Sequence, residues 1–181
     1  MHFYLHAQDR AGVGAELVAR SEEHWSYMDR FADRLVLRGP TLSDDGEEHT
    51  GSVHVVDLSG RADAERFGHE EPFWRAGLYA DIVISRTVVL RSGATGTSTA
   101  LVTGRWSPAR HRTDGLTVPD GSRVDFLATL VDDESARTTG IVAAVSAPPD
   151  EAVSVVQPLA DRLAGRPVTL TAHRWQRGGR S

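Results

Sequence analysis

The chain has 181 residues, a formal net charge of −5 at pH 7 and no cysteine, and all 20 of its basic residues are arginine. These features exclude disulfides, thiolate nucleophiles, lysine Schiff bases and phosphate-binding loops that need a lysine. The arginines are scattered among acidic residues without a basic stripe, so no nucleic-acid partner is expected. No apolar run reaches the roughly 20 residues that span a bilayer, and the chain opens with a strand pattern, which predicts a cytoplasmic protein without membrane contact.

The first half of the chain alternates strand and helix patterns. Residues 2–8 alternate apolar and polar side chains, as a strand with one buried face does. Residues 14–33 predict a helix, whose apolar stripe consists of Leu17, Val18, Trp25, Met28, Phe31, Ala32 and Leu35. Further strands are expected over residues 35–37, 51–58 and 79–89, with a short helix between residues 59 and 71. This order predicts a ferredoxin-like unit, an antiparallel sheet with two helices on one face.

The second half partly repeats this order after a linker rich in Gly, Ser and Thr at residues 91–98. The expected elements are strands over residues 99–106, 123–131, 139–146 and 167–175 and a helix over 149–164 that Pro158 should kink or break. A Pro- and Gly-containing stretch replaces the first helix. We interpret the chain as a diverged internal duplication, with one unit over residues 1–90 and a second over residues 99–181. The expected fold is α+β, with two tandem ferredoxin-like units whose sheets form a pseudo-dimeric α+β barrel, either as a monomer or as a homodimer.

Six short motifs of the first half occur in the order typical of one family. They are Ala7-Gln8-Asp9, His24 with Tyr27-Met28, Gly39-Pro40, Asp44-Asp45-Gly46, Gly51-Ser52 and Glu71-Pro72-Phe73. On these motifs residues 1–90 resemble the YciI-like, or YCII-related, family. The resemblance implies a dimeric α+β barrel with a small cleft between helix and sheet, and a catalytic pair of a histidine and an acidic residue. The family usually has aspartate where this chain has Glu71 before Pro72-Phe73. Some relatives are dehydrochlorinases of hydroxylated aromatics.

His24 is the strongest candidate for chemistry. It lies on the inward stripe of the first predicted helix, where an ionisable side chain costs stability unless it is paired. Imidazole titrates near neutral pH and suits proton transfer, although a neutral core histidine would fit the same position. A catalytic base also needs an orienting carboxylate. Asp9, after the first strand, and Glu71, after the second helix, are both candidates, and the spacing does not decide between them.

Four further residues are expected to bind a substrate. Ser52 begins a strand after a glycine, where its hydroxyl or the adjacent amide could hold a substrate oxygen. Tyr27 follows His24 by three residues. Phe73 and Trp74 come directly after Pro72 and would form a pocket wall, or alternatively a hydrophobic plug over the end of the core.

A metal site is the alternative use of the histidines. His6 and His54 belong to strands that neighbour each other in a ferredoxin-like sheet, and two imidazoles with a carboxylate could bind zinc or iron. No local ligand spacing supports such a site. No metal and no cofactor are therefore expected.

These residues favour a cofactor-independent acid/base enzyme, a lyase or isomerase of the elimination type, acting on a small oxygenated or aromatic organic molecule. Two other functions stay open. One is a non-catalytic protein of the same fold that binds a small molecule or acts as a scaffold. The other is a cofactor-free oxygenase, which would need an aromatic side chain such as Trp25 or Trp74 against the cavity.

Overall fold

The computed structural model describes residues 1–110, 116–119, 121–134 and 136–179, which form two compact units. The first unit consists of Met1–Ile84 with Arg177–Ser181, and the second of Ser85–Gln176. The elements are β1 (His2–Asp9), α1 (Gly14–Ala19), α2 (Ser21–Asp29), β2 (Leu35–Leu42), β3 (His49–Asp57), α3 (Arg61–His69), α4 (Pro72–Arg75), β4 (Tyr79–Ser92), β5 (Ala100–Arg110), β6 (Val124–Val131), β7 (Arg137–Val145), α5 (Pro149–Ala164) and β8 (Thr171–Trp175). The division between the units lies inside β4, before residues 91–98, which were expected to form the linker. Strand β4 continues to Ser92, and its second part pairs with β6 of the second unit.

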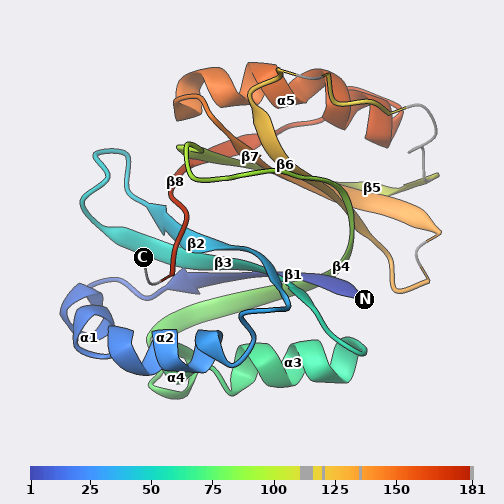
Figure 1. Cartoon of the computed structure of the whole chain (residues 1–181). Helices are drawn as coiled ribbons and strands as arrows, with labels where there is room; N and C mark the ends of the chain where they lie inside the picture. The colour runs from blue at the N-terminus through green and yellow to red at the C-terminus, as the bar shows by residue number, and fades with distance from the viewer. Residues whose placement is uncertain (111–115, 120, 135, 180–181) are drawn as a thin grey trace. The chain divides into compact units, whose positions relative to one another are not determined.

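In the first unit, β1 lies between β4 and β3, and β2 follows β3 at the other side. The pairs β1–β3 and β2–β3 are antiparallel. Helices α1 to α4 lie along one face of these strands (Figure 1). The buried core between helices and sheet consists of Phe3, Leu5, Tyr27, Met28, Val56, Leu58, Ala64 and Phe67. Odd-numbered residues of β1 and even-numbered residues of β3 therefore face the helices.

The helix expected over residues 14–33 is interrupted at Arg20. Arg20 ends α1 and precedes α2 with φ −106° and ψ 6°, outside the helical geometry of both neighbours. The interruption changes the direction of the second helix's apolar face, and α2 ends at Asp29, so the predicted stripe is wrong at three positions. Val18 and Ala32 are exposed, and Trp25 is 39% exposed. The buried residues of α2 are Tyr27 and Met28, which leaves His24 at the border between the core and the surface of the helix.

Two strand boundaries also differ from the sequence prediction. β2 does not stop before Gly39-Pro40, because its pairing with β3 continues through Pro40, which faces Ser52, to Leu42. A proline within a strand removes only the hydrogen bond of its own missing N–H. β3 begins at His49 rather than Gly51, which brings His49 next to the end of β1.

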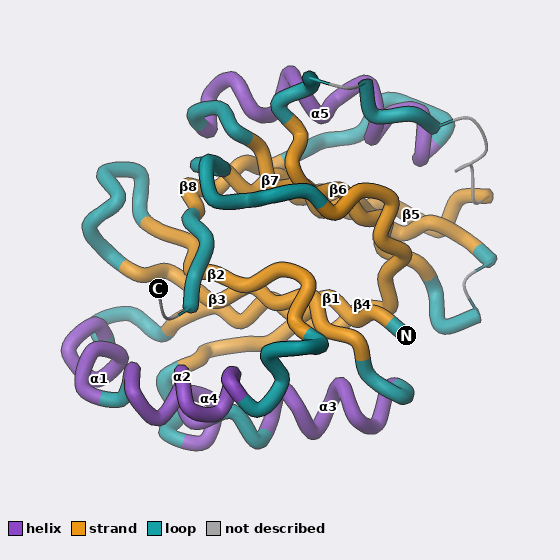
Figure 2. Tube along the Cα trace, in the orientation of Figure 1, coloured by secondary structure: helices purple, strands orange, loops and turns teal. Residues whose placement is uncertain are grey.

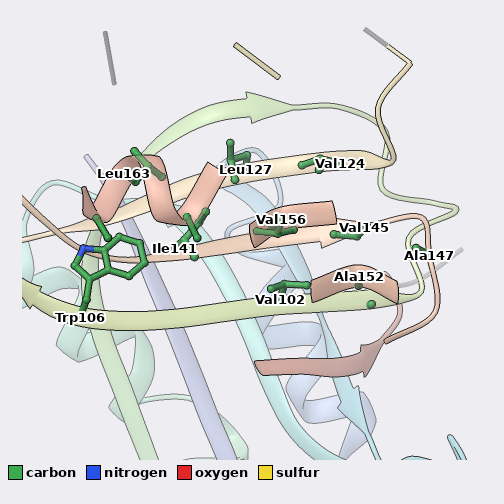
Figure 3. Close-up of a cluster of buried hydrophobic side chains, with 14 residues drawn as sticks. Val102, Trp106, Val124, Leu127, Ile141, Val145, Ala147, Ala152, Val156 and Leu163 are labelled. Carbon is green, nitrogen blue, oxygen red and sulfur yellow. The ribbon is translucent and has the colours of Figure 1, made fainter. Parts of the chain in front are cut away.

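The second unit has the strand order β8–β5–β7–β6–β4, with antiparallel pairs wherever a register is defined. One helix, α5, lies along this sheet (Figure 2). Leu163 and Val156 of α5 pack on strand residues that include Ile141, Val145 and Leu127 (Figure 3). The described residues between β5 and β6 contain no helix, and residues 111–115 and 120 of the stretch expected to replace the first helix lie outside the described residues.

Helix α5 has the predicted boundaries but is not broken at Pro158. Pro158 lies on the exposed side of the helix, whereas the opposite side buries Ala152, Val156, Ala160 and Leu163. Burial of this stripe offsets the one backbone hydrogen bond that proline removes. Both units thus combine an antiparallel sheet with helices on one face, which confirms the α+β class and the two tandem ferredoxin-like units. Within the described part of the chain, no helix is long and apolar enough to cross a membrane.

Candidate active site

His24 and Glu71 form a close pair between α2 and the start of α4. The Nδ1 atom of His24 lies 2.5 Å from Oε1 of Glu71. The histidine side chain is 12% exposed and the glutamate side chain 3% exposed. Little water reaches the pair, so a hydrogen bond between a carboxylate and an imidazole is stronger here than it would be on the surface.

The local sequence explains why a glutamate is buried at residue 71. The residue before a proline prefers an extended backbone, and Glu71 has φ −62° and ψ 134°. Pro72 then begins α4, a position that suits proline because the first helical N–H has no partner. The Oε2 atom of Glu71 accepts a hydrogen bond from the backbone N–H of Trp74 at 3.0 Å. One carboxylate therefore caps a helix with one oxygen and holds His24 with the other.

Aromatic rings enclose the imidazole of His24. The ring of Phe73 stacks on it with a centroid distance of 4.5 Å and an interplanar angle of 6°. Phe73 also meets the ring of Tyr79 edge-on at 5.8 Å. Phe73 is thus part of the wall of this site, whereas the indole of Trp74 lies against His69, at a ring distance of 4.9 Å. These contacts fix the plane of the imidazole.

His54 belongs to this site and not to a metal centre with His6. The register pairs His54 with Leu5 and His6 with Val53, so the two histidines point to opposite faces of the sheet. They therefore do not lie on one face of the sheet, as a metal site shared by both imidazoles would require. His54 faces the helices, 5.9 Å from the ring of His24. Burial first, and then the neighbouring basic groups, lower the pKa of His54 well below 6.5, so this imidazole is neutral at pH 7. Among the described residues no group of three metal-ligating side chains occurs.

Asp9 pairs with a histidine that the sequence had not singled out. Its Oδ2 atom lies 2.6 Å from Nδ1 of His49, with side-chain exposures of 5% for Asp9 and 28% for His49. The other oxygen, Oδ1, is buried and has no hydrogen-bond partner among the described residues. The signal that could have found His49 is topological, because β1 ends and β3 begins at the same edge of an antiparallel pair.

Ser52 and Tyr79 form a second buried polar contact. The hydroxyl of Tyr79 donates a hydrogen bond to Oγ of Ser52 at 2.8 Å. Burial, with a further contribution from Glu71, raises the pKa of Tyr79 well above 10, so the phenol stays protonated. Ser52 is thus buried and accepts from a protein partner while keeping its own O–H as a donor, and Tyr79 is a site residue that sequence reasoning missed.

A groove of about 530 Å³ lies between α2 and the segment 70–76. It is lined by Arg20, Glu23, Ser26, Tyr27, Arg30, Glu70, Pro72, Arg75 and Ala76. Neither His24 nor Glu71 lines it. Tyr27 lies one helical turn after His24, however, and Pro72 directly follows Glu71, so the groove runs beside the pair.

Tyr27 should lower the free energy of unfolding as the pH rises above 10. Its hydroxyl donates to the carbonyl of Phe67 at 3.0 Å, and burial together with Glu70 raises its pKa from 10.0 to about 12. The stabilisation from the protonated phenol is complete below pH 10, where the unfolded chain also keeps the proton, and is lost as the pH rises towards 12. In urea unfolding at about pH 9, the free energy of unfolding of wild type should exceed that of Tyr27→Phe by about 1 kcal/mol, the typical contribution of one hydrogen bond. This difference should shrink or reverse at about pH 11, between the two pKa values; an unchanged difference would contradict the assignment.

A known family matches the first half of the chain only, whereas similar folds are found over nearly the whole chain. The family model of the YCII-related domain matches residues 1–87. The match covers 87 of the 181 residues and lies within the first half of the chain. No curated protein gives a significant match. Helix α2 with His24, the Glu71 turn and the groove all belong to the part that the family model covers.

Several solved structures are similar to this chain, among them the following three. A "putative monooxygenase" from Lactobacillus acidophilus has 10% identity and a TM-score of 0.53, covering 97% of this chain and 93% of that one. A second, from Fusobacterium nucleatum, has 7% identity and a TM-score of 0.53, covering 97% and 91%. These two likenesses concern the fold alone. A 5-chloro-2-hydroxyhydroquinone dehydrochlorinase from Burkholderia phenoliruptrix, solved with 2,5-dihydroxybenzoquinone, has 26% identity and a TM-score of 0.45, covering 48% of this chain and 92% of that one.

Proposed function

We propose that this protein is a cofactor-independent acid/base enzyme that carries out an elimination or isomerisation on a small oxygenated or aromatic organic molecule. His24 is the proton carrier in this proposal, and Glu71 is its orienting carboxylate. The observation that carries the proposal is the 2.5 Å contact between Nδ1 of His24 and Oε1 of Glu71, whose side chains are 12% and 3% exposed. A base held by a third group in this way is the usual arrangement for proton transfer at neutral pH.

The chemistry follows from the two ring nitrogens. When Nδ1–H donates a hydrogen bond to Oε1 of Glu71, Nε2 keeps a free lone pair and acts as the base. In an elimination, Nε2 takes a proton from a carbon of the substrate, the C–H electron pair forms the new double bond, and the leaving group departs with its own electron pair. Glu71 stabilises the imidazolium that forms, and Nε2 then returns the proton to the leaving group or to solvent.

The first alternative is a binding or scaffold protein with the same pocket. It would be favoured by a histidine satisfied by backbone groups, with no carboxylate in reach. The carboxylate of Glu71 in direct contact with His24 supports the catalytic proposal instead. The oxygenase alternative would need an aromatic side chain such as Trp25 or Trp74 against the cavity, whereas neither lines the groove, Trp25 is 39% exposed and Trp74 packs on His69. Of the two carboxylates first considered, Glu71 takes the orienting role, and Asp9 is held by His49.

Isotope exchange tests the proposal whatever the net reaction is. The protein is incubated in D2O with a panel of hydroxylated and halogenated aromatics and small carbonyl compounds, and NMR follows deuterium incorporation at carbon and the appearance of products. We expect catalysed exchange or conversion for at least one compound, dependent on His24. Binding without exchange across the panel would support the non-catalytic alternative and remove the enzymatic one.

A further inference from the structure

The groove beside α2 has an uneven charge lining. Arg20 is paired with Glu23, at 3.1 Å, and these two charges cancel. Arg30 and Arg75 also line the groove, and among the described residues neither has a carboxylate within ion-pair distance. Glu70 is the remaining acidic group of the lining. Two guanidinium groups thus face one carboxylate, and the groove carries an excess of positive charge.

The guanidinium of Arg30 is held in a way that leaves its donors free. It lies 5.1 Å from the ring centroid of Tyr27 and 5.8 Å from that of Phe31. A guanidinium stacked on an aromatic face keeps its N–H groups in the plane, where they can bind a carboxylate with two parallel hydrogen bonds. The stacking also reduces the rotamer freedom that an exposed arginine would lose on binding.

We propose that this groove is the subsite that binds the carboxylate of an organic acid, with Arg30 and Arg75 as the anion-binding residues. The volume of about 530 Å³ accommodates a ring-sized molecule. The ring of Tyr27 and the side chain of Pro72 supply apolar contact surface for such a body. A free inorganic anion would leave this apolar surface unused, so an organic carboxylate fits the lining better.

Tyr27 connects the groove to the His24–Glu71 pair. Tyr27 lines the groove one helical turn after His24, and Arg75 lines it four residues after Glu71. A carboxylate held at Arg75 therefore places the rest of the ligand next to the segment that carries Glu71. This link to catalysis rests on the proposed function, whereas binding of the carboxylate to the groove does not.

Two matched probes distinguish the contribution of ligand charge to binding from the contribution of ligand shape. The two probes are benzoate and benzamide, which have the same ring and nearly the same size but differ in charge. Amide signals of Ser26, Tyr27 and Ala76 are followed by NMR during each titration. Wild type should bind benzoate about three- to tenfold more tightly than benzamide, which corresponds to less than about 1.4 kcal/mol. Arg30→Ala and Arg75→Ala should each remove most of this preference and leave benzamide binding unchanged.

Two control variants distinguish binding in the groove from a general effect of net charge and from the catalytic proposal. Arg137→Ala removes an exposed arginine of the second unit, with the same change in net charge, and should leave both affinities unchanged. His24→Asn should bind benzoate like wild type, so a failure of the catalytic proposal would not affect this result. The inference is overturned if benzoate shifts none of the groove amides, binds no better than benzamide, or keeps its affinity in the Arg30→Ala/Arg75→Ala double variant.

Discussion

His24→Asn should lower the rate of proton transfer at this site by about 10²- to 10⁴-fold, the usual contribution of a general base. Asparagine keeps a side-chain N–H that can donate to Glu71, so the buried carboxylate retains a partner and the fold should persist. The substitution removes only the second nitrogen, which is the base in the proposed mechanism. The measurement is the initial rate of deuterium exchange on the compound found in the panel, together with a circular dichroism spectrum.

Two further variants define what this result means. His69→Ala removes an exposed histidine that contacts Trp74, and it should leave the exchange rate within about twofold, since surface substitutions rarely propagate. His24→Ala should lose activity like His24→Asn but should also be less stable, because Oε1 of Glu71 loses its partner. An exchange rate in His24→Asn equal to that of wild type would exclude His24 as the proton carrier.

Glu71→Ala should have the largest effect on stability among the site variants. Removing a helix cap costs about 1 kcal/mol, and leaving a buried imidazole without its charged partner costs about 1–3 kcal/mol more. We therefore expect the free energy of unfolding to fall by about 2–4 kcal/mol, measured as a lower midpoint of urea unfolding with an unchanged slope. Exchange activity should fall as well, because His24 is no longer held in one orientation.

Glu71→Gln and Glu70→Ala are the matched controls for this prediction. Glutamine keeps an acceptor for the N–H of Trp74, so it should recover the capping part of the loss while activity stays low. Glu70 is exposed in the neighbouring position, and its removal should change stability by less than about 0.5 kcal/mol. Equal stability losses for Glu71→Ala and Glu70→Ala would show that the buried pair adds nothing to the fold.

The sequence predicts those parts of the fold that depend on local periodicity. Helix α5 has the expected bounds from Pro149 to Ala164 because its apolar stripe is regular and a glycine follows it. The interruption at Arg20 is not predictable in the same way, because residues 15–33 contain neither proline nor glycine to mark it. Only the packing of two short helices on the sheet reveals that break, and with it the exposure of Trp25.

The candidate site depends on contacts between residues far apart in the chain. His24 and Glu71 are 47 positions apart, and Asp9 and His49 are 40 apart. The helical stripe is enough to single out His24, but no spacing rule chooses between the two carboxylates. The register of β1 with β3 decides which side His54 faces, and a strand pattern with apolar residues on both faces does not specify it.

The tautomer of His24 tests the central claim most directly, because it needs no substrate. A protein labelled with ¹⁵N in its histidine rings is measured at a pH where His24 is neutral, and the shifts of its two ring nitrogens are assigned with Glu71→Gln as a reference. If Glu71 orients the imidazole as a base, Nδ1 carries the proton and Nε2 is bare. A proton on Nε2, with a bare Nδ1 facing Glu71, would leave the ring without a free base and would contradict the proposed mechanism.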